Sequence, residues 1–190
     1  MGLGKQAKIL SSAQQKAVLA SLTTRRHAIR NRCVFLLSVD AGLRAKEVAS
    51  IEWSMITDAE GNLTDEIRLE NKAAKGASGG VVYISKRLKQ ALSELAESGS
   101  RQVHVVTNSR GQAMSAQVVT NWFFHLYRDL GFEGCSSHSG RRTAITRWSR
   151  KISSVGGSLR DVQALARHAS LQTTERYIEL SEQAGRKVVG

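Results

Sequence analysis

The chain has 190 residues, enough for one domain with a hydrophobic core, and its 28 Lys and Arg exceed its 16 Asp and Glu to give a formal net charge of +12. This charge favours a polyanionic partner, either nucleic acid or an anionic membrane. The longest apolar runs, such as residues 33–37, fall far short of the ~20 residues of a membrane span, and the N-terminus lacks the apolar core of a secretion signal. Two cysteines without a CxxC pair argue against a zinc site or a disulfide scaffold.

The first part of the chain is predicted to be helical. Residues 1–10 are small and basic, and we expect them to form a flexible arm. A serine-capped helix should cover 11–22. A longer helix over 23–42 should end at Gly42, because glycine accepts the left-handed conformation at a helix C-terminus. A short helix is then expected to begin near Arg44.

After this helix the apolar spacing changes to alternation. Residues 51–56, 66–69 and 80–84 each favour a strand, which together predict a small three-stranded antiparallel sheet. The glycine-rich loop between the last two strands holds Lys72 and Lys75.

The rest of the chain returns to helical spacing. Helices are predicted over 85–97 and 115–130, with a short strand at 103–106 between them. Beyond them, three more capped helices are expected to begin at Ser137, Ser158 and Thr173. We find no internal repeat and no convincing domain boundary, so the sequence predicts a mainly helical α+β fold.

Several side chains suit the binding of a phosphate group. His138 and Arg141 are three apart and share one face of a helix, where arginine offers a planar fork and histidine can move a proton. Arg44 follows a glycine turn that can aim donors at an anion. Lys75 can protonate a departing oxygen. Taken alone, each is better explained as a solvated surface charge.

Tyr177, expected on the last helix, follows His168 by nine residues, and the turn between these successive helices lets the two side chains meet. A phenol is a poor nucleophile at neutral pH, but clustered cations stabilise the negative charge that develops as it attacks, and a phosphodiester is the natural electrophile. Taken alone, a buried structural histidine and a core tyrosine are the simpler interpretations.

Together these residues match a known pattern. From Ala41 onward the chain resembles the catalytic domain of the tyrosine recombinases, the phage integrase family. The matching motifs are AGLRAKEV (41–48), KGASGGVVYI (75–84), HSGRR (138–142) and LARHASLQTTERY (165–177). The resemblance implies an integrase-type catalytic fold.

The resemblance also implies six catalytic residues, of the types that the family has: Arg44, Lys75, His138, Arg141, His168 and Tyr177. Lys72 is the alternative hairpin lysine. The chain departs from the family at Arg167, where glycine is usual, and at Gly156-Gly157, which lengthens the stretch between the last two motifs.

The implied chemistry is the breaking and rejoining of DNA. Tyr177 would form a 3′-phosphotyrosyl bond while the two arginines hold the nonbridging oxygens. Lys75 would protonate the leaving 5′-oxygen, His138 would assist proton transfer and His168 would hydrogen-bond the phosphate. No metal ion and no cofactor are expected.

The implied partner is double-stranded DNA, bound by a homotetramer with an accessory DNA-bending protein in some reactions. The expected setting is the bacterial cytoplasm, at the nucleoid, for a bacterial or phage-encoded protein. Basic positions expected to contact phosphates include Arg25, Arg26, Arg30, Arg32, Lys86, Arg87, Arg142, Arg147 and Arg150.

Residues 11–190 are expected to be one catalytic domain without a separate N-terminal core-binding domain, and the start at Met1 favours a complete short protein over a fragment. Two other functions stay open. One is a non-catalytic DNA-binding regulator derived from an integrase, and the other is a type IB topoisomerase-like enzyme that relaxes DNA without a partner site.

Overall fold

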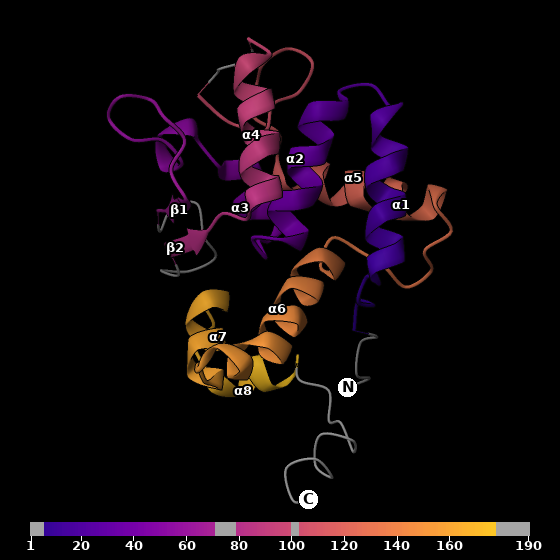
Figure 1. Cartoon of the computed structure of the whole chain (residues 1–190). Coiled ribbons are helices and arrows are strands. Elements are labelled where there is room, and N and C mark those ends of the chain that lie inside the picture. The colour runs from indigo at the N-terminus through magenta and orange to yellow at the C-terminus, as the bar shows by residue number, and fades with distance from the viewer. Residues whose placement is uncertain (1–5, 71–78, 100–102, 178–190) are drawn as a thin grey trace, which may run out of the picture. The chain divides into compact units, whose positions relative to one another are not determined.

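The structure is a computed structural model that describes residues 6–70, 79–99 and 103–177 (Figure 1). The chain divides into an N-terminal unit (residues 1–144) and a C-terminal unit (residues 145–190). The elements are α1 (Ser12–Thr23), α2 (Ala28–Val39), α3 (Ala45–Ser50), η1 (Trp53–Met55), β1 (Glu66–Leu69), β2 (Gly80–Tyr83), α4 (Lys86–Glu97), α5 (Ala116–Asp129), α6 (Ser139–Ile152), η3 (Ser153–Val155), α7 (Leu159–Ala166) and α8 (Leu171–Glu175).

Serine side chains begin several of these helices. The hydroxyl oxygens of Ser11, Ser85 and Ser115 each accept a hydrogen bond from the backbone N–H three residues ahead, which satisfies one of the donors left open at a helix start. The predicted starts of α1, α4 and α5 are therefore confirmed to within a residue or two. Such caps are local in sequence, so they can be predicted without the fold.

Two predicted helix starts are wrong. The second helix begins at Ala28 and not near Thr23, because His27 takes a left-handed conformation with φ of 60° and separates it from α1. The last helix begins at Leu171 and not at Thr173, because Ser170 is the residue that caps it, through the Thr173 N–H.

The core of the N-terminal unit is built around α2. Every residue of α2 from Cys33 to Val39 is buried. A helix that is apolar on all sides must be surrounded, and α1, α3 and α4 all pack against α2; Figure 1 shows α2 between α1 and α4. The aromatic rings of Phe123 and Tyr127, on α5, and of Phe132, which follows it, stack in series.

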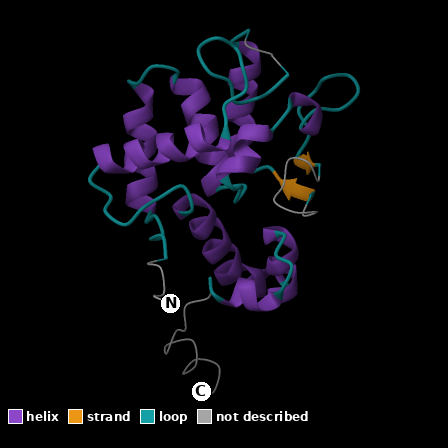
Figure 2. Ribbon diagram, turned by 180° about the vertical axis from the view of Figure 1, so that it is seen from behind, coloured by secondary structure: helices purple, strands orange, loops and turns teal. Residues whose placement is uncertain are grey.

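The predicted three-stranded sheet is wrong, since the described residues form two paired strands (Figure 2). β1 and β2 are antiparallel, with Ile67 opposite Val82. The expected strand over 51–56 is instead the 3-10 helix η1, joined to the 103–106 region by one isolated bridge, Glu52 to His104. The apolar side chains of this segment are buried, but the backbone N–H groups of Met55 and Ile56 form hydrogen bonds within the 3-10 turn, so no strand ladder forms.

The C-terminal unit has a much smaller core. Ile145, Val162 and Ala166 are wholly buried, and Trp148 and Tyr177 are among the side chains that pack around them. Tyr177 lies in the turn that follows α8, and not on the helix as predicted.

Candidate active site

Arg44 lies at the turn between α2 and α3. Gly42 takes the left-handed conformation, with φ of 65°, and so ends the run of α2 as predicted. The Arg44 N–H donates to Glu47 Oε2 at 2.8 Å, and its guanidinium Nη1 donates to Glu47 Oε1 at 2.9 Å. The Glu47 side chain is fully buried whereas 27% of the Arg44 side chain is exposed. The buried Glu47 carboxylate therefore holds both the backbone N–H and the guanidinium of Arg44 in place.

Arg141 is brought to the same turn from far along the chain. It is buried, and its Nη1 donates to the Gly42 carbonyl at 2.6 Å. The preceding Gly140 permits this approach, because a Cβ there would lie 2.3 Å from Ser38 Oγ. The first turn of α6 thus packs directly on the end of α2, which orients the arginine.

An ion pair with a buried carboxylate supports this turn. The Asp40 carboxylate, 2% exposed, accepts hydrogen bonds from Arg87 Nε at 2.6 Å, from Arg87 Nη2 at 2.5 Å and from Ser85 Oγ at 2.7 Å. These bonds raise the pKa of Arg87. These hydrogen bonds join the end of α2 to the start of α4. Asp40, which accepts them, lies two residues before Gly42. Sequence reasoning missed Asp40, because nothing local pairs it with Arg87.

His138 is the residue immediately before α6. It is exposed, its carbonyl accepts from the Arg142 N–H at 2.9 Å, and its own N–H donates to Ser136 Oγ at 3.3 Å. His138 and Arg141 therefore share the first turn of this helix, close to the predicted start.

The described part of the N-terminal arm, residues 6–10, is attached to this same segment. Lys8 N–H donates to the Gly134 carbonyl at 3.0 Å, and Leu10, 2% exposed, donates its N–H to Thr143 Oγ1 at 2.9 Å. Arg142 donates to the side chain of Gln6. Residues 6–10 are thus held against the start of α6.

In the C-terminal unit, His168 stacks on Tyr177. Their ring centroids are 5.3 Å apart and their planes differ by 27°. His168 Nδ1 lies 2.9 Å from Thr174 Oγ1, and the His168 backbone both donates to and accepts from Gln163, at 3.1 Å each. Thr146 Oγ1 donates to the Tyr177 carbonyl at 3.2 Å. The two side chains that the sequence expected on successive helices do meet.

The backbone at Arg167 takes a conformation that glycine adopts without strain. Arg167 ends α7 in the left-handed conformation, with φ of 52° and ψ of 47°, a region that costs an L-residue with a Cβ about 1–2 kcal/mol. The chain keeps an arginine there, next to His168, in spite of that strain.

The structure therefore places the expected residues in two groups, each within its own unit. Arg44, His138 and Arg141 belong to the N-terminal unit, and His168 and Tyr177 to the C-terminal unit. Lys75 and its alternative Lys72 lie outside the described residues. Sequence reasoning missed Thr174 and Gln163, although both lie beside or inside the last motif; their contact with His168 depends on how the turn folds.

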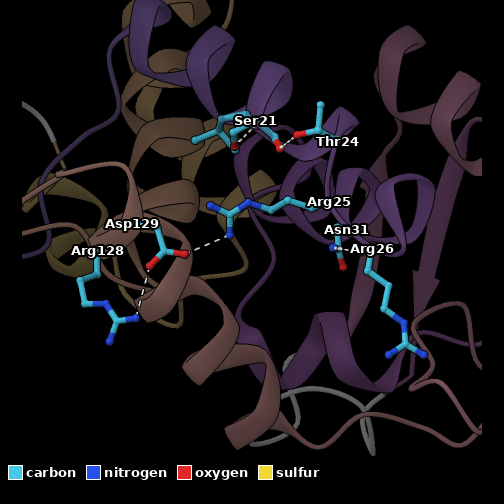
Figure 3. Close-up of polar contacts among 8 residues, drawn as sticks. Ser21, Thr24, Arg25, Arg26, Asn31, Arg128 and Asp129 are labelled. Carbon is cyan, nitrogen blue, oxygen red and sulfur yellow. Dashed lines mark hydrogen bonds and ion pairs between the residues drawn. The ribbon is translucent and has the colours of Figure 1, made fainter.

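Some basic residues expected to contact DNA are already paired with acids. Arg25 forms an ion pair with Asp129 at 3.1 Å, and Arg128 lies 3.3 Å from the same carboxylate (Figure 3). Arg32 pairs with Glu94 and Arg87 with Asp40. A phosphate would have to displace these carboxylates, so the three paired arginines are weaker candidates than the sequence suggested.

A cavity of about 430 Å³ lies elsewhere in the N-terminal unit, at the start of α2. His27, Arg30, Leu95 and Thr107 are among its lining residues. Twelve helical residues span roughly 18 Å, so the cavity is at the other end of α2 from Gly42. It is not part of the candidate site.

Neither a metal site nor a membrane span is visible in the described residues. Within residues 6–70, 79–99 and 103–177, no three His, Cys, Asp or Glu side chains gather as metal ligands. Across the same residues, no helix has the length and apolar character to cross a bilayer.

The sequence matches the family model described as the phage integrase family over residues 8–184. It is 27% identical over 159 residues to a tyrosine recombinase XerC of Pelobacter propionicus, covering 82% of this chain and 49% of that protein. It is 28% identical over 183 residues to a tyrosine recombinase XerD of Lacticaseibacillus casei, covering 92% of this chain and 59% of that protein. The chain thus spans about half the length of the curated relatives that it matches.

Solved structures share the fold. The XerA recombinase superposes with a TM-score of 0.74 at 18% identity, over 99% of this chain and 64% of that chain. The XerH site-specific recombinase bound to difH substrate, in a pre-cleavage complex, gives a TM-score of 0.72 at 20% identity, over 100% of this chain and 55% of that chain.

Proposed function

The chain belongs to the phage integrase family, and we propose on that premise that it is a site-specific DNA recombinase that breaks and rejoins strands through a covalent bond to Tyr177. The observation that supports this most directly is the Gly42–Arg44 turn. Arg141 bonds to the carbonyl of Gly42, two residues before Arg44, so two cations from distant motifs are held at one turn. A phosphate that carries charge on two nonbridging oxygens suits such a pair.

The proposed reaction is a phosphoryl transfer. The Tyr177 hydroxyl attacks the scissile phosphorus, a bond from the phenolic oxygen to phosphorus forms, and the bond to the 5′-oxygen breaks. His138 takes the phenolic proton and Lys75, or Lys72, gives a proton to the departing 5′-oxygen. Arg44, Arg141 and His168 stabilise the charge on the phosphate oxygens. The reverse attack by the 5′-hydroxyl of a partner strand releases Tyr177.

The proposed partner is double-stranded DNA. The XerH structure that shares this fold holds a difH substrate, and a net charge of +12 favours a polyanion. We further propose that residues 11–190 act as the catalytic domain, that four copies assemble on DNA at the bacterial nucleoid, and that an accessory DNA-bending protein assists some reactions. Binding should weaken steeply as salt rises.

The test is to trap the covalent adduct. Duplex fragments of the DNA that flanks the gene, each carrying a nick so that the released strand diffuses away, are incubated with the protein in EDTA. Denaturing gels should show a protein–DNA adduct with wild-type chain and none with Tyr177→Phe. Sequencing of the trapped DNA then gives the site.

Two outcomes would contradict the proposal. DNA binding without any adduct would favour the regulator, and an adduct that persists in Tyr177→Phe would move the nucleophile elsewhere. Relaxation of a supercoiled plasmid that lacks the trapped site would instead favour the topoisomerase-like enzyme.

A further inference from the structure

In the hydrogen bond between His168 and Thr174, the partners available to the threonine hydroxyl determine which side chain donates. His168 Nδ1 and Thr174 Oγ1 are 2.9 Å apart, and the two residues are 7% and 0% exposed. A neutral imidazole carries one proton, on either Nδ1 or Nε2, and the hydrogen bond to one nitrogen decides which is favoured.

Thr174 leaves one satisfactory arrangement. Among the residues that the structure describes, Nδ1 of His168 is the hydrogen-bond partner of the Thr174 hydroxyl. If Nδ1 carried the proton, the hydroxyl would accept it, and the hydroxyl hydrogen would be left without an acceptor in the same part of the chain. A buried donor without an acceptor is unfavourable, so the hydroxyl donates and Nδ1 accepts.

We propose that Thr174 is a positioning residue that holds neutral His168 with its proton on Nε2. His168 then offers an Nε2–H donor to a phosphate oxygen without first gaining a proton. The direction of that donor is fixed as well, since Gln163 holds the His168 backbone and the Tyr177 ring stacks on the imidazole. The role of the donor rests on the proposed function, whereas the tautomer does not.

The tautomer can be measured without DNA. The full chain is labelled with ¹⁵N-histidine, and His168→Gln identifies the signals of His168 among the five histidines. Wild-type spectra at a pH where the ring is neutral should show a protonated Nε2 and an unprotonated Nδ1. Thr174→Val, which keeps the shape and removes the hydroxyl, should give a mixture of tautomers, and Thr174→Ser should restore the wild-type pattern.

Single-turnover cleavage of the trapped site gives the second readout. Thr174→Val should slow adduct formation about tenfold, less than the ~10²–10³ that follows the loss of a whole donor. Thr174→Ser should recover the rate. Thr173→Val is the matched control, because the Thr173 hydroxyl contacts Ser170 and not His168.

Three results would overturn the proposal: a proton on Nδ1 in the wild-type chain, an unchanged tautomer in Thr174→Val, or a changed tautomer with wild-type cleavage. A purely structural role would lower the melting temperature of Thr174→Val and leave the tautomer as it is. A wild-type chain that forms no adduct would refute the proposed function alone, since the spectra decide the tautomer independently.

Discussion

The two units hold their functional side chains in different ways. In the N-terminal unit, Arg44 and Arg141 depend on contacts between segments far apart in sequence, such as the bond from Arg141 to Gly42 and the packing of Gly140 on Ser38. In the C-terminal unit, His168 is held by hydrogen bonds to residues within six positions along the chain and by the ring of Tyr177, nine positions away.

This difference follows from the size of the two cores. The second half of α2, from Cys33 to Val39, is buried on all sides and provides a closely packed end on which a turn can be oriented. The C-terminal unit has a core of three wholly buried hydrophobic residues among those described, so local hydrogen bonds must do more of the positioning. Under the proposed function, the phosphate-binding arginines lie on the unit with the larger core and the nucleophile on the unit with the smaller core.

The largest expected effect tests the phosphate-binding role of the N-terminal unit. Arg44→Ala should slow adduct formation by ~10²–10³, because one charged donor to the phosphate is lost. Single-turnover cleavage on denaturing gels measures this. Arg68→Ala is the control, since Arg68 is largely exposed and paired with Glu66 on the strand. Equal rates of adduct formation for the two variants would show that Arg44 does not take part in the reaction.

A smaller effect tests the long-range packing. Gly140→Ala should destabilise the N-terminal unit by about 1–3 kcal/mol, because the new Cβ would overlap Ser38. Urea denaturation followed by tryptophan fluorescence measures the change. Ser38→Gly should recover part of the loss in the double variant. Independent, additive effects of the two changes would show that this close approach does not constrain the fold.

Relief of backbone strain should raise the free energy of unfolding, by less than the Gly140 substitution lowers it. His27 is exposed and left-handed, and its side chain makes no capping hydrogen bond, so His27→Gly should stabilise the N-terminal unit by about 0.5 kcal/mol. Thr24→Gly, at a residue with φ of −97°, should destabilise it. Thermal unfolding of the pair compares them, and a lower melting temperature for His27→Gly would contradict the strain.

The smallest effect concerns the start of α7 in the C-terminal unit. The hydrogen bond from the Ser158 N–H lowers the pKa of Asp161 below its usual 3.8. A lowered folded-state pKa means that the stabilisation is complete above the unfolded value and is lost as pH falls through the folded one. Asp161→Asn should remove this pH-dependent part of the stability. Urea unfolding midpoints measured between pH 6 and 2 test this. Glu175→Gln, an exposed change on α8, should retain it.

The sequence predicted what depends on neighbours along the chain. The serine caps of α1, α4 and α5, and the end of α2 at Gly42, follow from local backbone chemistry. The pairing of Asp40 with Arg87 could not be predicted, because only the fold brings the two together. The strand expected at 51–56 was wrong for a related reason, because the spacing of apolar residues does not say whether a pairing strand is available.

The family motifs predicted candidate functional side chains, but they did not predict the contacts that position these side chains. Arg141 and His168 were expected as phosphate ligands, and those roles stay predictions. Their supports, the Gly42 carbonyl and the Thr174 hydroxyl, carry no signal of their own in the sequence, since carbonyls are everywhere and threonine is common.

The contact between Arg141 and the Gly42 carbonyl has one more consequence. A carboxylate would orient a guanidinium and cancel much of its charge at the same time, and an incoming anion would then compete with it. A carbonyl dipole can align the planar fork without adding a negative charge beside it. The bond from Arg141 to Gly42 thus orients a guanidinium through a neutral group, whereas the bond from Arg44 to Glu47 orients one through a group of opposite sign.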